Sequence, residues 1–481
     1  MLLAIIVSSF LIAAAGSALI RVRRVMEILS LSASVVALAA ASVIAYKVGT
    51  HGTYSPVTFF SIDSMGAVIT LIVATVACFA SMYSIPYFRK ESAKNIIGLR
   101  RIQQYNVLVN VFLAACFLAA TASNPVAAWI FLEITTLSTV FLISYYNRAV
   151  TIEAAWKYLI INAIGLLLAF FGTLLFMSTT GHGVEGFVTW QNLKTSVMHI
   201  DPSIVKIAFI FILIGYGTKI GLAPMHTWKP DAYSKSPAPL GALLSGALMP
   251  VAFLIMLRFK VVTDVAVGMS YSRSLLIAFG LMSVIVAALS ILTVKNYKRM
   301  LAYSSIEHAG LMALGFGFGG LGAFAALMLM IYHSLVKSSL FFASGNLLIQ
   351  YHSERIQKIK GAMSVLPATA TLLLIGMFAA TGLPPFGIFL TELSIMSAGL
   401  QGRHLAIAAI AMIALAVVFI GFFRQVSAMV LSEKPAEKVK PIGDSFWLIA
   451  PPVALLTITL VISFYMPSFM QTLIHQAVTG L

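Results

Sequence analysis

Four ionisable residues lie in stretches of sequence that are otherwise apolar enough to be embedded in lipid. They are two acids and two bases: Glu133, Glu392, Lys219 and Lys337. A charged side chain at the centre of a membrane helix costs about 2.5 to 3.5 kcal/mol on insertion scales, so it usually faces an opposite charge or water. A long side chain near a helix end has an alternative, because it can reach the headgroups by snorkelling. Residues without that alternative mark candidate functional sites.

Glu133 and Lys219 have the features of a buried ion pair. Glu133 has apolar sequence on both sides and no helix end nearby. Lys219 lies about 21 Å along its segment from Val205, at 1.5 Å per residue; snorkelling is the alternative interpretation for this lysine. Gly215 and Gly217 beside it allow another helix to approach closely. A carboxylate near an ammonium keeps both groups charged, and weakening that contact lowers the proton affinity of the lysine.

His333 and Lys337 are spaced four residues apart, which places both on one face of a helix, one turn apart. An imidazole gains or loses a proton near neutral pH, so the pair resembles two stations of a proton relay. A structural role is the alternative for a lone buried histidine. Glu392 lies further along the chain, in Phe389-Leu-Thr-Glu-Leu; it is either a third station or a residue of the membrane interface.

Three further ionisable residues are auxiliary candidates. Glu307 and His308 follow Arg299 by eight and nine residues, deep enough in their segment to need partners or water. Adjacent residues point in different directions on a helix, so we expect only one of them to face the path. Lys157 lies near the start of its segment, where snorkelling is an equal alternative. These acids and bases alternate without a pocket motif for an organic substrate, so the inferred cargo is a proton or a small cation.

The elements that position these residues are predicted to be membrane helices. The chain is 60% hydrophobic and only 10% charged over 481 residues, whereas a typical soluble domain is about 25% charged. Apolar runs of about 20 residues, enough to cross a bilayer, recur along the whole chain. The sequence therefore predicts an all-α polytopic membrane protein with about fourteen segments. The segments begin near Leu2, Ile28, Met65, Tyr105, Val126, Ala155, Val205, Leu240, Leu275, Met300, Ala323, Ala368, Leu405 and Phe446.

The distribution of basic residues predicts the orientation. Lysines and arginines are roughly three times more frequent in the loops after odd-numbered segments than in the others, which places those loops in the cytoplasm by the positive-inside rule. Both termini are then expected on the non-cytoplasmic side of the cell membrane. The net charge of +16 is spread over these short clusters rather than over one basic domain, so it does not indicate nucleic-acid binding.

Two segments are interrupted by helix-breaking residues, the seventh at Gly221-Leu-Ala-Pro224 and the twelfth at Gly382-Leu-Pro-Pro-Phe-Gly387. They lie five segments apart, as equivalent positions of a five-helix repeat would, and such paired breaks indicate the central site of a transporter. A loop position beyond the helix end is the alternative for Pro224. The predicted organisation is N-terminal helices 1–3 (residues 1–104), a first inverted repeat of helices 4–8 (105–260), a second of helices 9–13 (261–431), and a C-terminal loop with helix 14 (432–481).

No cofactor or metal site is predicted on this chain. Cys78 and Cys116 both lie in apolar segments without a partner at metal or redox spacing. Glycine motifs of the Walker and dinucleotide types are absent from the sequence, which argues against ATP-driven transport and NAD chemistry on this polypeptide.

Four stretches of the sequence are specific: His226-Thr-Trp-Lys-Pro-Asp-Ala-Tyr-Ser-Lys-Ser-Pro-Ala-Pro, Lys298-Arg-Met-Leu-Ala-Tyr-Ser-Ser-Ile-Glu-His, His333-Ser-Leu-Val-Lys337 and Gly382-Leu-Pro-Pro-Phe-Gly-Ile-Phe-Leu-Thr-Glu392. With them the sequence resembles a known family: the antiporter-like subunits shared by respiratory complex I, Mrp-type cation antiporters and energy-converting membrane hydrogenases. The resemblance implies a core of fourteen helices with two inverted repeats. It also implies that Glu133 and Lys219 are the paired residues of the first half-channel, that Lys337 with His333 is the central or exit-side relay, and that Glu392 is the terminal acid.

The sequence departs from the family pattern at two places. Many relatives have a lysine in segment 8 where this chain reads Ala247-Leu-Met-Pro250. In the loop after segment 7, Lys229 and Tyr233 stand where a hydrophobic residue and a histidine are common. The stretches Glu153-Ala-Ala-Trp-Lys-Tyr and Ser-Ser-Ile-Glu-His look most like the hydrogenase and formate hydrogenlyase branch.

Three functions are therefore distinguished. The leading one is a proton-translocating membrane subunit of a redox-driven complex, with other membrane subunits as partners and no redox chemistry on this chain. The first alternative is a module of an Mrp-like complex that exchanges Na⁺ for protons. The second is a membrane scaffold that does not conduct.

Overall fold

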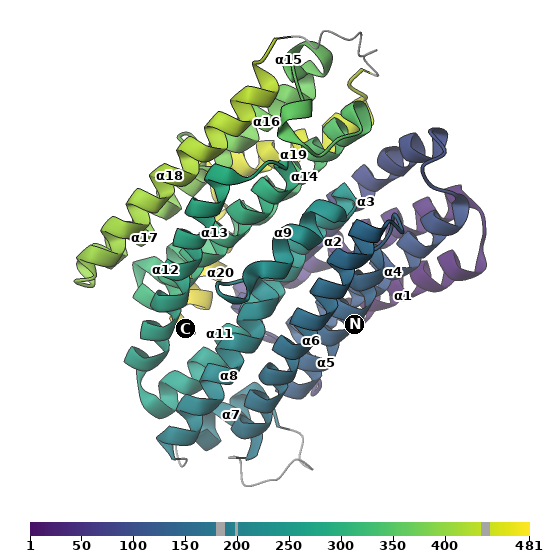
Figure 1. Ribbon diagram of the computed structural model, residues 1–481. Coiled ribbons are helices and arrows are strands. Elements are labelled where there is room, and N and C mark those ends of the chain that lie inside the picture. The colour runs from purple at the N-terminus through teal and green to yellow at the C-terminus, as the bar shows by residue number, and fades with distance from the viewer. Residues whose placement is uncertain (179–187, 198–200, 434–442) are drawn as a thin grey trace.

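The computed structural model describes residues 1–178, 188–197, 201–433 and 443–481. These residues form a bundle of helices that run side by side, with α1 and α4 at one edge, α17 and α18 at the other, and α3 and α14 between them (Figure 1). A single small hairpin, β1 (Tyr54–Val57) paired antiparallel with β2 (Phe60–Ile62), is the only sheet in this part of the chain. The predicted all-α membrane class is confirmed.

Twelve helical units of the described residues are long and apolar enough to cross a membrane. They are α1 (Leu2–Leu19), α2 (Arg23–His51), α3 (Ser64–Ala93), α4 (Leu99–Thr121), α5 (Pro125–Ile143), α6 (Ala149–Ser178), the unit Pro202–Lys235, the unit Ala238–Val267, α12 (Met269–Thr293), α14 (Leu321–Tyr351), α18 (Leu405–Val430) and α19 (Phe446–Phe464).

The remaining helices are shorter or more polar. The predicted tenth segment corresponds to α13 (Tyr297–Phe318), which is not among the twelve because Glu307 and His308 lower its mean hydropathy. The predicted twelfth corresponds to α16 (Pro367–Ala380) and α17 (Gly387–Gln401), two pieces that are each too short. The others are α7 (Trp190–Ser196), α15 (Ala362–Val365) and α20 (Ser468–Thr479).

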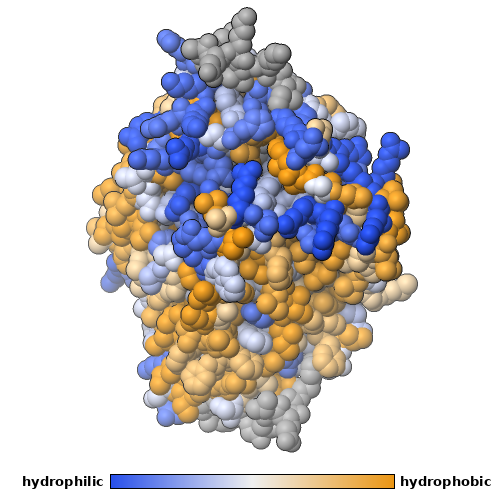
Figure 2. All heavy atoms as spheres, turned by 45° about the vertical axis from the view of Figure 1, so that its right-hand side comes forward, coloured by the Kyte–Doolittle hydropathy of each residue, from blue (hydrophilic) through white to orange (hydrophobic). Residues whose placement is uncertain are grey.

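The surface matches a lipid environment. Large apolar side chains such as Trp156 (58%), Leu289 (63%) and Phe171 (48%) are exposed, an arrangement that is stable only where the solvent is hydrocarbon. Figure 2 shows hydrophilic residues gathered over one end of the molecule, above a broad hydrophobic face. We call this the basic end; there α3, α5, α12 and α14 finish and α4, α6 and α13 begin.

Two breaks open the backbone inside the bundle. The unit Pro202–Lys235 is divided into α8 (Pro202–Ile220) and α9 (Trp228–Lys235) by Gly221, whose φ of 84° is left-handed. Between α16 and α17, Gly382 has a φ of 63°. Each break leaves a backbone carbonyl without a donor from its own helix. At membrane depth no water replaces that donor, so another protein group must donate to the carbonyl. Lys229 Nζ bonds the Ile220 carbonyl at 2.8 Å and His308 Nε2 bonds the Ala380 carbonyl at 2.9 Å.

A third irregularity lies in the unit Ala238–Val267. Here α10 (Ala238–Leu243) and α11 (Met249–Val267) are joined by a wide π turn over Leu244–Leu248. Pro250 has no backbone N–H to give to the preceding turn, which explains the local change of winding. The turn directs Ser245 toward α14, as described below.

Candidate functional site

Lys219 is the centre of a first buried cluster. Its side chain is 2% exposed and enters from the last turn of α8. The ammonium donates to Thr136 Oγ1 and to Tyr158 Oη, both at 2.9 Å. Tyr158 Oη in turn lies 2.7 Å from Thr139 Oγ1. The lysine is therefore held by hydroxyl groups of α5 and α6, and does not snorkel to the surface.

Glu133 joins this cluster through a bridging hydroxyl. Thr136, one turn later on α5, donates from Oγ1 to Glu133 Oε2 at 3.4 Å and accepts the hydrogen bond from Lys219. The predicted pairing of Glu133 with Lys219 is thus indirect, because Thr136 stands between them. Gly215 does allow close approach as expected, but the helix that it contacts is α6: a Cβ there would lie 2.5 Å from the backbone nitrogen of Ala169.

Lys337 is the centre of a second cluster with the same pattern. Its ammonium, fully buried on α14, donates to Ser304 Oγ at 2.5 Å. Ser304 donates to Glu307 Oε2 at 3.2 Å, and both residues lie on α13. In both clusters a buried lysine is therefore separated from a glutamate by one hydroxyl group. We call Lys219–Thr136–Glu133 the first triplet and Lys337–Ser304–Glu307 the second triplet.

A chain of histidines lies beside the second triplet. His308 Nε2 faces the Ala380 carbonyl at 2.9 Å, and a carbonyl only accepts, so this nitrogen carries the hydrogen. The other nitrogen, Nδ1, then accepts from His333 Nδ1 at 2.8 Å, and His333 Nε2 accepts from Ser245 Oγ at 3.3 Å. His333 is therefore paired with His308 rather than with Lys337. Both Glu307 and His308 face the buried cluster, where the sequence predicts only one of them.

Glu392 closes this side of the cluster. It lies in the second turn of α17 and is buried among the helices at 9% exposure. Gly382 makes room for it, since a Cβ there would overlap Glu392 Oε2. Carboxylate oxygens of Glu307 and Glu392 lie within 4.8 Å of each other and of a His308 nitrogen. Because both His308 nitrogens are engaged, by the Ala380 carbonyl and by His333, the two carboxylates are the groups left to bind a cation or share a proton.

Lys157 lies apart from both clusters. It is about half exposed near the start of α6 and forms ion pairs with Glu153 at 2.6 Å and Asp231 at 3.4 Å. This position agrees with the snorkelling alternative, because a lysine in the first turns of a helix reaches the membrane surface easily.

The structure adds a buried lysine that the sequence analysis places in a loop. Lys229 is fully buried, since the chain continues through the bundle as α9 after the break at Gly221. Its ammonium bonds the Ile220 carbonyl at 2.8 Å and lies 3.7 Å from Met249 Sδ. The sequence gives little signal of this burial, because the stretch from Met225 to Lys235 contains several charged residues and does not continue the apolar run.

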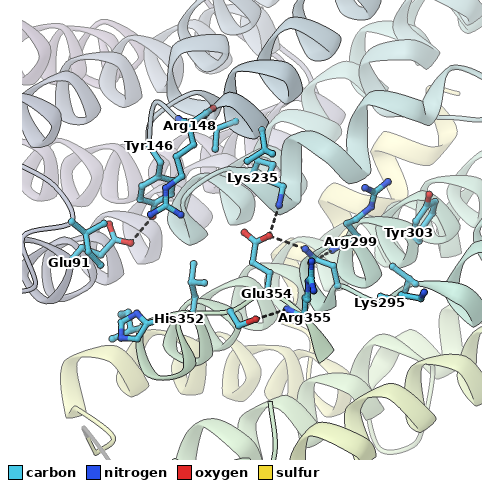
Figure 3. A pocket seen from close by; sticks show the side chains of 18 of the residues that line it. Glu91, Tyr146, Arg148, Lys235, Lys295, Arg299, Tyr303, His352, Glu354 and Arg355 are labelled. Atoms are coloured by element: carbon cyan, nitrogen blue, oxygen red, sulfur yellow. Dashed lines mark hydrogen bonds and ion pairs between the residues drawn. The ribbon is translucent and has the colours of Figure 1, made fainter. Parts of the chain in front are cut away.

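A cavity of about 780 Å³ opens among the helix ends at the basic end. Figure 3 shows basic side chains around it, including Arg148, Lys235 and Arg355, with Glu354 between them. Glu354 accepts from Lys235 at 2.7 Å and from Asn296 at 2.9 Å.

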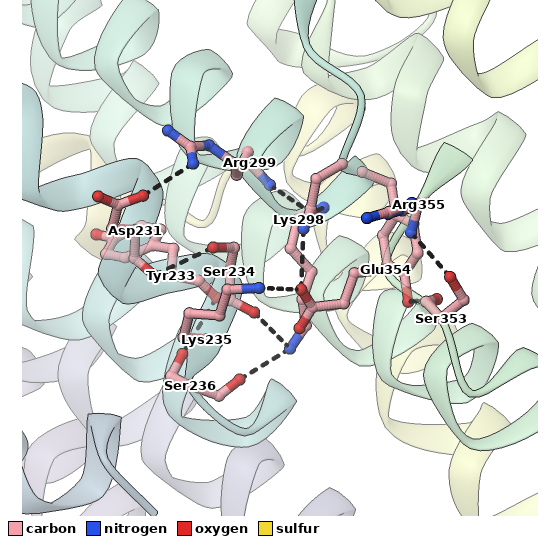
Figure 4. Close-up of polar contacts among 12 residues, drawn as sticks. Asp231, Tyr233, Ser234, Lys235, Ser236, Lys298, Arg299, Ser353, Glu354 and Arg355 are labelled. Atoms are coloured by element: carbon pink, nitrogen blue, oxygen red, sulfur yellow. Dashed lines mark hydrogen bonds and ion pairs between the residues drawn. The ribbon is translucent and has the colours of Figure 1, made fainter. Parts of the chain in front are cut away.

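Below this cavity a polar network fixes α9 against α13 (Figure 4). Lys298 Nζ donates to the carbonyls of Ser236 at 2.8 Å and Ser234 at 3.4 Å, and Arg299 pairs with Asp231 at 2.9 Å. Two of the sequence stretches that carry the resemblance therefore contact each other here.

A family model described as NADH:quinone oxidoreductase/Mrp antiporter, TM, matches residues 122–421, which contain both triplets. The chain belongs to this family. The resemblance expected from the motifs is confirmed.

Individual relatives agree with this assignment. The chain is 36% identical over 395 residues to the hydrogenase-4 component F homolog of Methylacidiphilum infernorum, covering 81% of each chain. It is 27% identical over 381 residues to NADH-quinone oxidoreductase subunit N of Halorhodospira halophila, covering 78% of this chain and 76% of that one. Its fold is similar to a chain in the archaeal membrane-bound sulfane sulfur reductase, with a TM-score of 0.89, 24% identity, and coverage of 99% and 97%.

Proposed function

We propose that this member of the antiporter family is a proton-translocating membrane subunit of a larger redox-driven complex, similar to a membrane-bound hydrogenase or complex I. The observation that carries the proposal is the repetition of one arrangement, a buried lysine joined to a glutamate by a single hydroxyl group. Other subunits would supply the electron transfer, and the names of the relatives support partners of that kind.

The triplets suit proton transfer because the hydroxyl is both acceptor and donor. In the first triplet, Lys219 releases a proton to Thr136 Oγ1 while Thr136 releases its own to Glu133. The step converts an ammonium and a carboxylate into an amine and a carboxylic acid, and the threonine is unchanged. The second triplet can perform the same step through Ser304.

The proposed chain crosses the membrane fourteen times. Its two inverted repeats are residues 105–260 and 261–431; N-terminal helices (1–104) precede them, and a loop with the last helix (432–481) follows. Glu133 and Glu307 support the repeat, because they lie on predicted segments 5 and 10, five apart. The basic end would face the cytoplasm, so both termini would face the other side. Residues 434–442 of the predicted C-terminal loop lie outside the described residues.

Proton uptake by inverted membrane vesicles that contain the assembled complex tests this function. Lys219→Ala and Glu133→Ala are expected to abolish redox-coupled uptake while the complex still assembles. Unchanged uptake in both variants would refute the proposal. Assembly without any proton movement in the wild-type complex would favour the scaffold.

A second candidate, exchange of Na⁺ for protons, is favoured by one observation. Glu392 Oε1 is buried without a hydrogen-bond partner. A carboxylate oxygen of Glu392 lies within 4.8 Å of one of Glu307, so two carboxylates are available to a cation. Na⁺ dependence of proton movement that is lost in Glu392→Gln would select this function. The same rate in Na⁺ and in K⁺ buffers would exclude it.

A further inference from the structure

The two triplets do not contact each other directly through the hydrogen bonds described above. Lys229 lies between the elements that carry them. Its ammonium bonds the carbonyl of Ile220, the residue directly after Lys219. On its other side it touches Met249, which directly follows the π turn that carries Ser245. Ser245 contacts His333 of the second cluster.

The surroundings of Lys229 are unusual for a structural lysine. Within the described residues no acid pairs with it, and the nearest in sequence, Asp231, is engaged by Arg299 and Lys157. An ammonium offers three N–H donors, but the contacts comprise one carbonyl, one weak thioether and the ring of Tyr233 at 5.6 Å. A site with so few acceptors accommodates the neutral amine as well as the ammonium, as a proton carrier requires.

We infer that Lys229 is the relay residue that connects the first triplet to the histidine chain and the second triplet. This inference rests on the proposed function and names a residue for it. It also accounts for the two departures from the family pattern together, because the added Lys229 and the segment 8 residue Met249 are in contact. In this chain the ammonium beside segment 8 belongs to Lys229 of α9, whereas many relatives carry a lysine in segment 8 itself.

The inference is tested in the assembled complex by proton uptake into vesicles, normalised to redox turnover. Lys229→Met is expected to reduce uptake at least about tenfold. Lys229→Arg keeps the charge but does not release a proton, so it is expected to lose uptake too while it assembles normally. The double variant Lys229→Met/Met249→Lys returns an ammonium to the same place from segment 8 and is expected to restore most of the uptake.

Normal uptake in Lys229→Arg would overturn the relay role, because charge alone would then suffice. Failure of the assembled double variant to recover would overturn it as well. Lys219→Ala separates the two claims: if it abolishes uptake while Lys229→Met does not, the inference fails and the proposed function stands. If neither variant changes uptake, the proposed function fails.

A second and independent observation concerns the cavity at the basic end. Seven basic residues line it against two acids. Glu91 is bonded by Tyr146 Oη at 2.6 Å, and Glu354 is engaged by Lys235. Five of the seven bases form no ion pair within the described residues: Lys90, Lys94, Arg148, Lys295 and Arg355.

The lining of the cavity suits an anion that also has an apolar part. Burial and repulsion from Lys90 lower the pKa of Lys94, and burial beside Lys94 lowers that of His352; a bound anion would relieve the repulsion. Ile96, Val150 and Leu348 add apolar surface to the lining. The helix ends place the cavity at the depth of lipid headgroups.

We propose that this cavity binds the phosphate headgroup of an anionic phospholipid. The test reconstitutes the full chain into phosphatidylcholine nanodiscs and measures binding of a fluorescent phosphatidylglycerol probe. Arg148→Gln/Lys295→Gln is expected to weaken phosphatidylglycerol binding by about thirtyfold, at roughly fivefold per basic residue. Lys47→Gln/Lys206→Gln removes the same charge from exposed positions at the opposite end and is expected to change nothing.

Equal binding of phosphatidylglycerol by both double variants would overturn the proposal. Displacement of the probe by millimolar inorganic phosphate would also overturn it, in favour of a site for free phosphate. Retention of the probe in phosphate supports the lipid.

Discussion

At the scale of the residue, the hydroxyl between lysine and glutamate is the feature with the clearest chemical role. A direct ion pair would hold its proton on the lysine, since each charge stabilises the other. With a hydroxyl in between, the proposed transfer is one concerted step, after which the lysine and the glutamate are both neutral and the hydroxyl is unchanged. Thr136 and Ser304 occupy this position in the two triplets.

Replacing the bridging hydroxyl is therefore expected to stop proton transfer without unfolding the helix. Thr136→Val keeps the shape of the side chain and removes its donor and acceptor. We expect proton uptake to fall at least about tenfold, with assembly retained. The control is Thr263→Val, another buried threonine, whose hydroxyl bonds only a backbone carbonyl of its own helix. Equal uptake in the two variants would show that the bridge is unnecessary.

The second triplet gives a parallel expectation. Ser304→Ala removes the hydroxyl that joins Lys337 to Glu307 and is expected to lower uptake to a similar extent. Ser334→Ala, which removes a hydroxyl bonded to Met330 on α14, is the matched control and is expected to behave as wild type. A larger loss in the control would contradict the assignment.

At the scale of the element, helix breaks and close helix contacts decide where the ionisable groups lie. The breaks near Gly221 and Gly382 were predictable, because glycine and proline patterns report backbone conformation locally. The partners of each group were not, because they depend on how distant helices pack. Thus Thr136 between Glu133 and Lys219, and His308 against His333, come from contacts between helices that no sequence period reports.

The burial of Lys229 could not be predicted from the sequence either. Its position directly after a proline-containing break reads as a loop, and its burial follows from the continuation of the chain as α9 inside the bundle. Likewise the fourteen predicted segments correspond to twelve long apolar units, because α13 is too polar and the α16–α17 region is divided.

The contact between α6 and α8 gives a stability prediction. A methyl group at Gly215 would lie 2.5 Å from the backbone nitrogen of Ala169, which cannot move aside without separating the helices. Gly215→Ala is expected to cost about 1 to 3 kcal/mol and to lower the thermal unfolding midpoint of the purified protein. Gly98→Ala, where no heavy atom lies within 4 Å, is the control. Equal midpoints would contradict the packing described here.

At the scale of the whole molecule, the distribution of charge predicts the orientation in the membrane. The exposed hydrophobic face lies beside one hydrophilic end (Figure 2), where bases outnumber acids around the cavity. Basic loops are retained in the cytoplasm. Alkaline phosphatase fused after Leu481 is therefore expected to be active, since it folds only outside the cytoplasm. Green fluorescent protein at the same place is expected to be dark. The opposite pair of results would reverse the orientation.

The central claim is that both triplets carry protons in series, so that loss of either stops translocation. The most direct measurement is proton uptake per redox turnover in vesicles that contain the assembled complex, compared among Lys219→Met, Lys337→Met and the exposed control Lys206→Met. We expect each buried-lysine variant alone to abolish uptake and the control to match wild type. Wild-type uptake in either buried-lysine variant would contradict the claim.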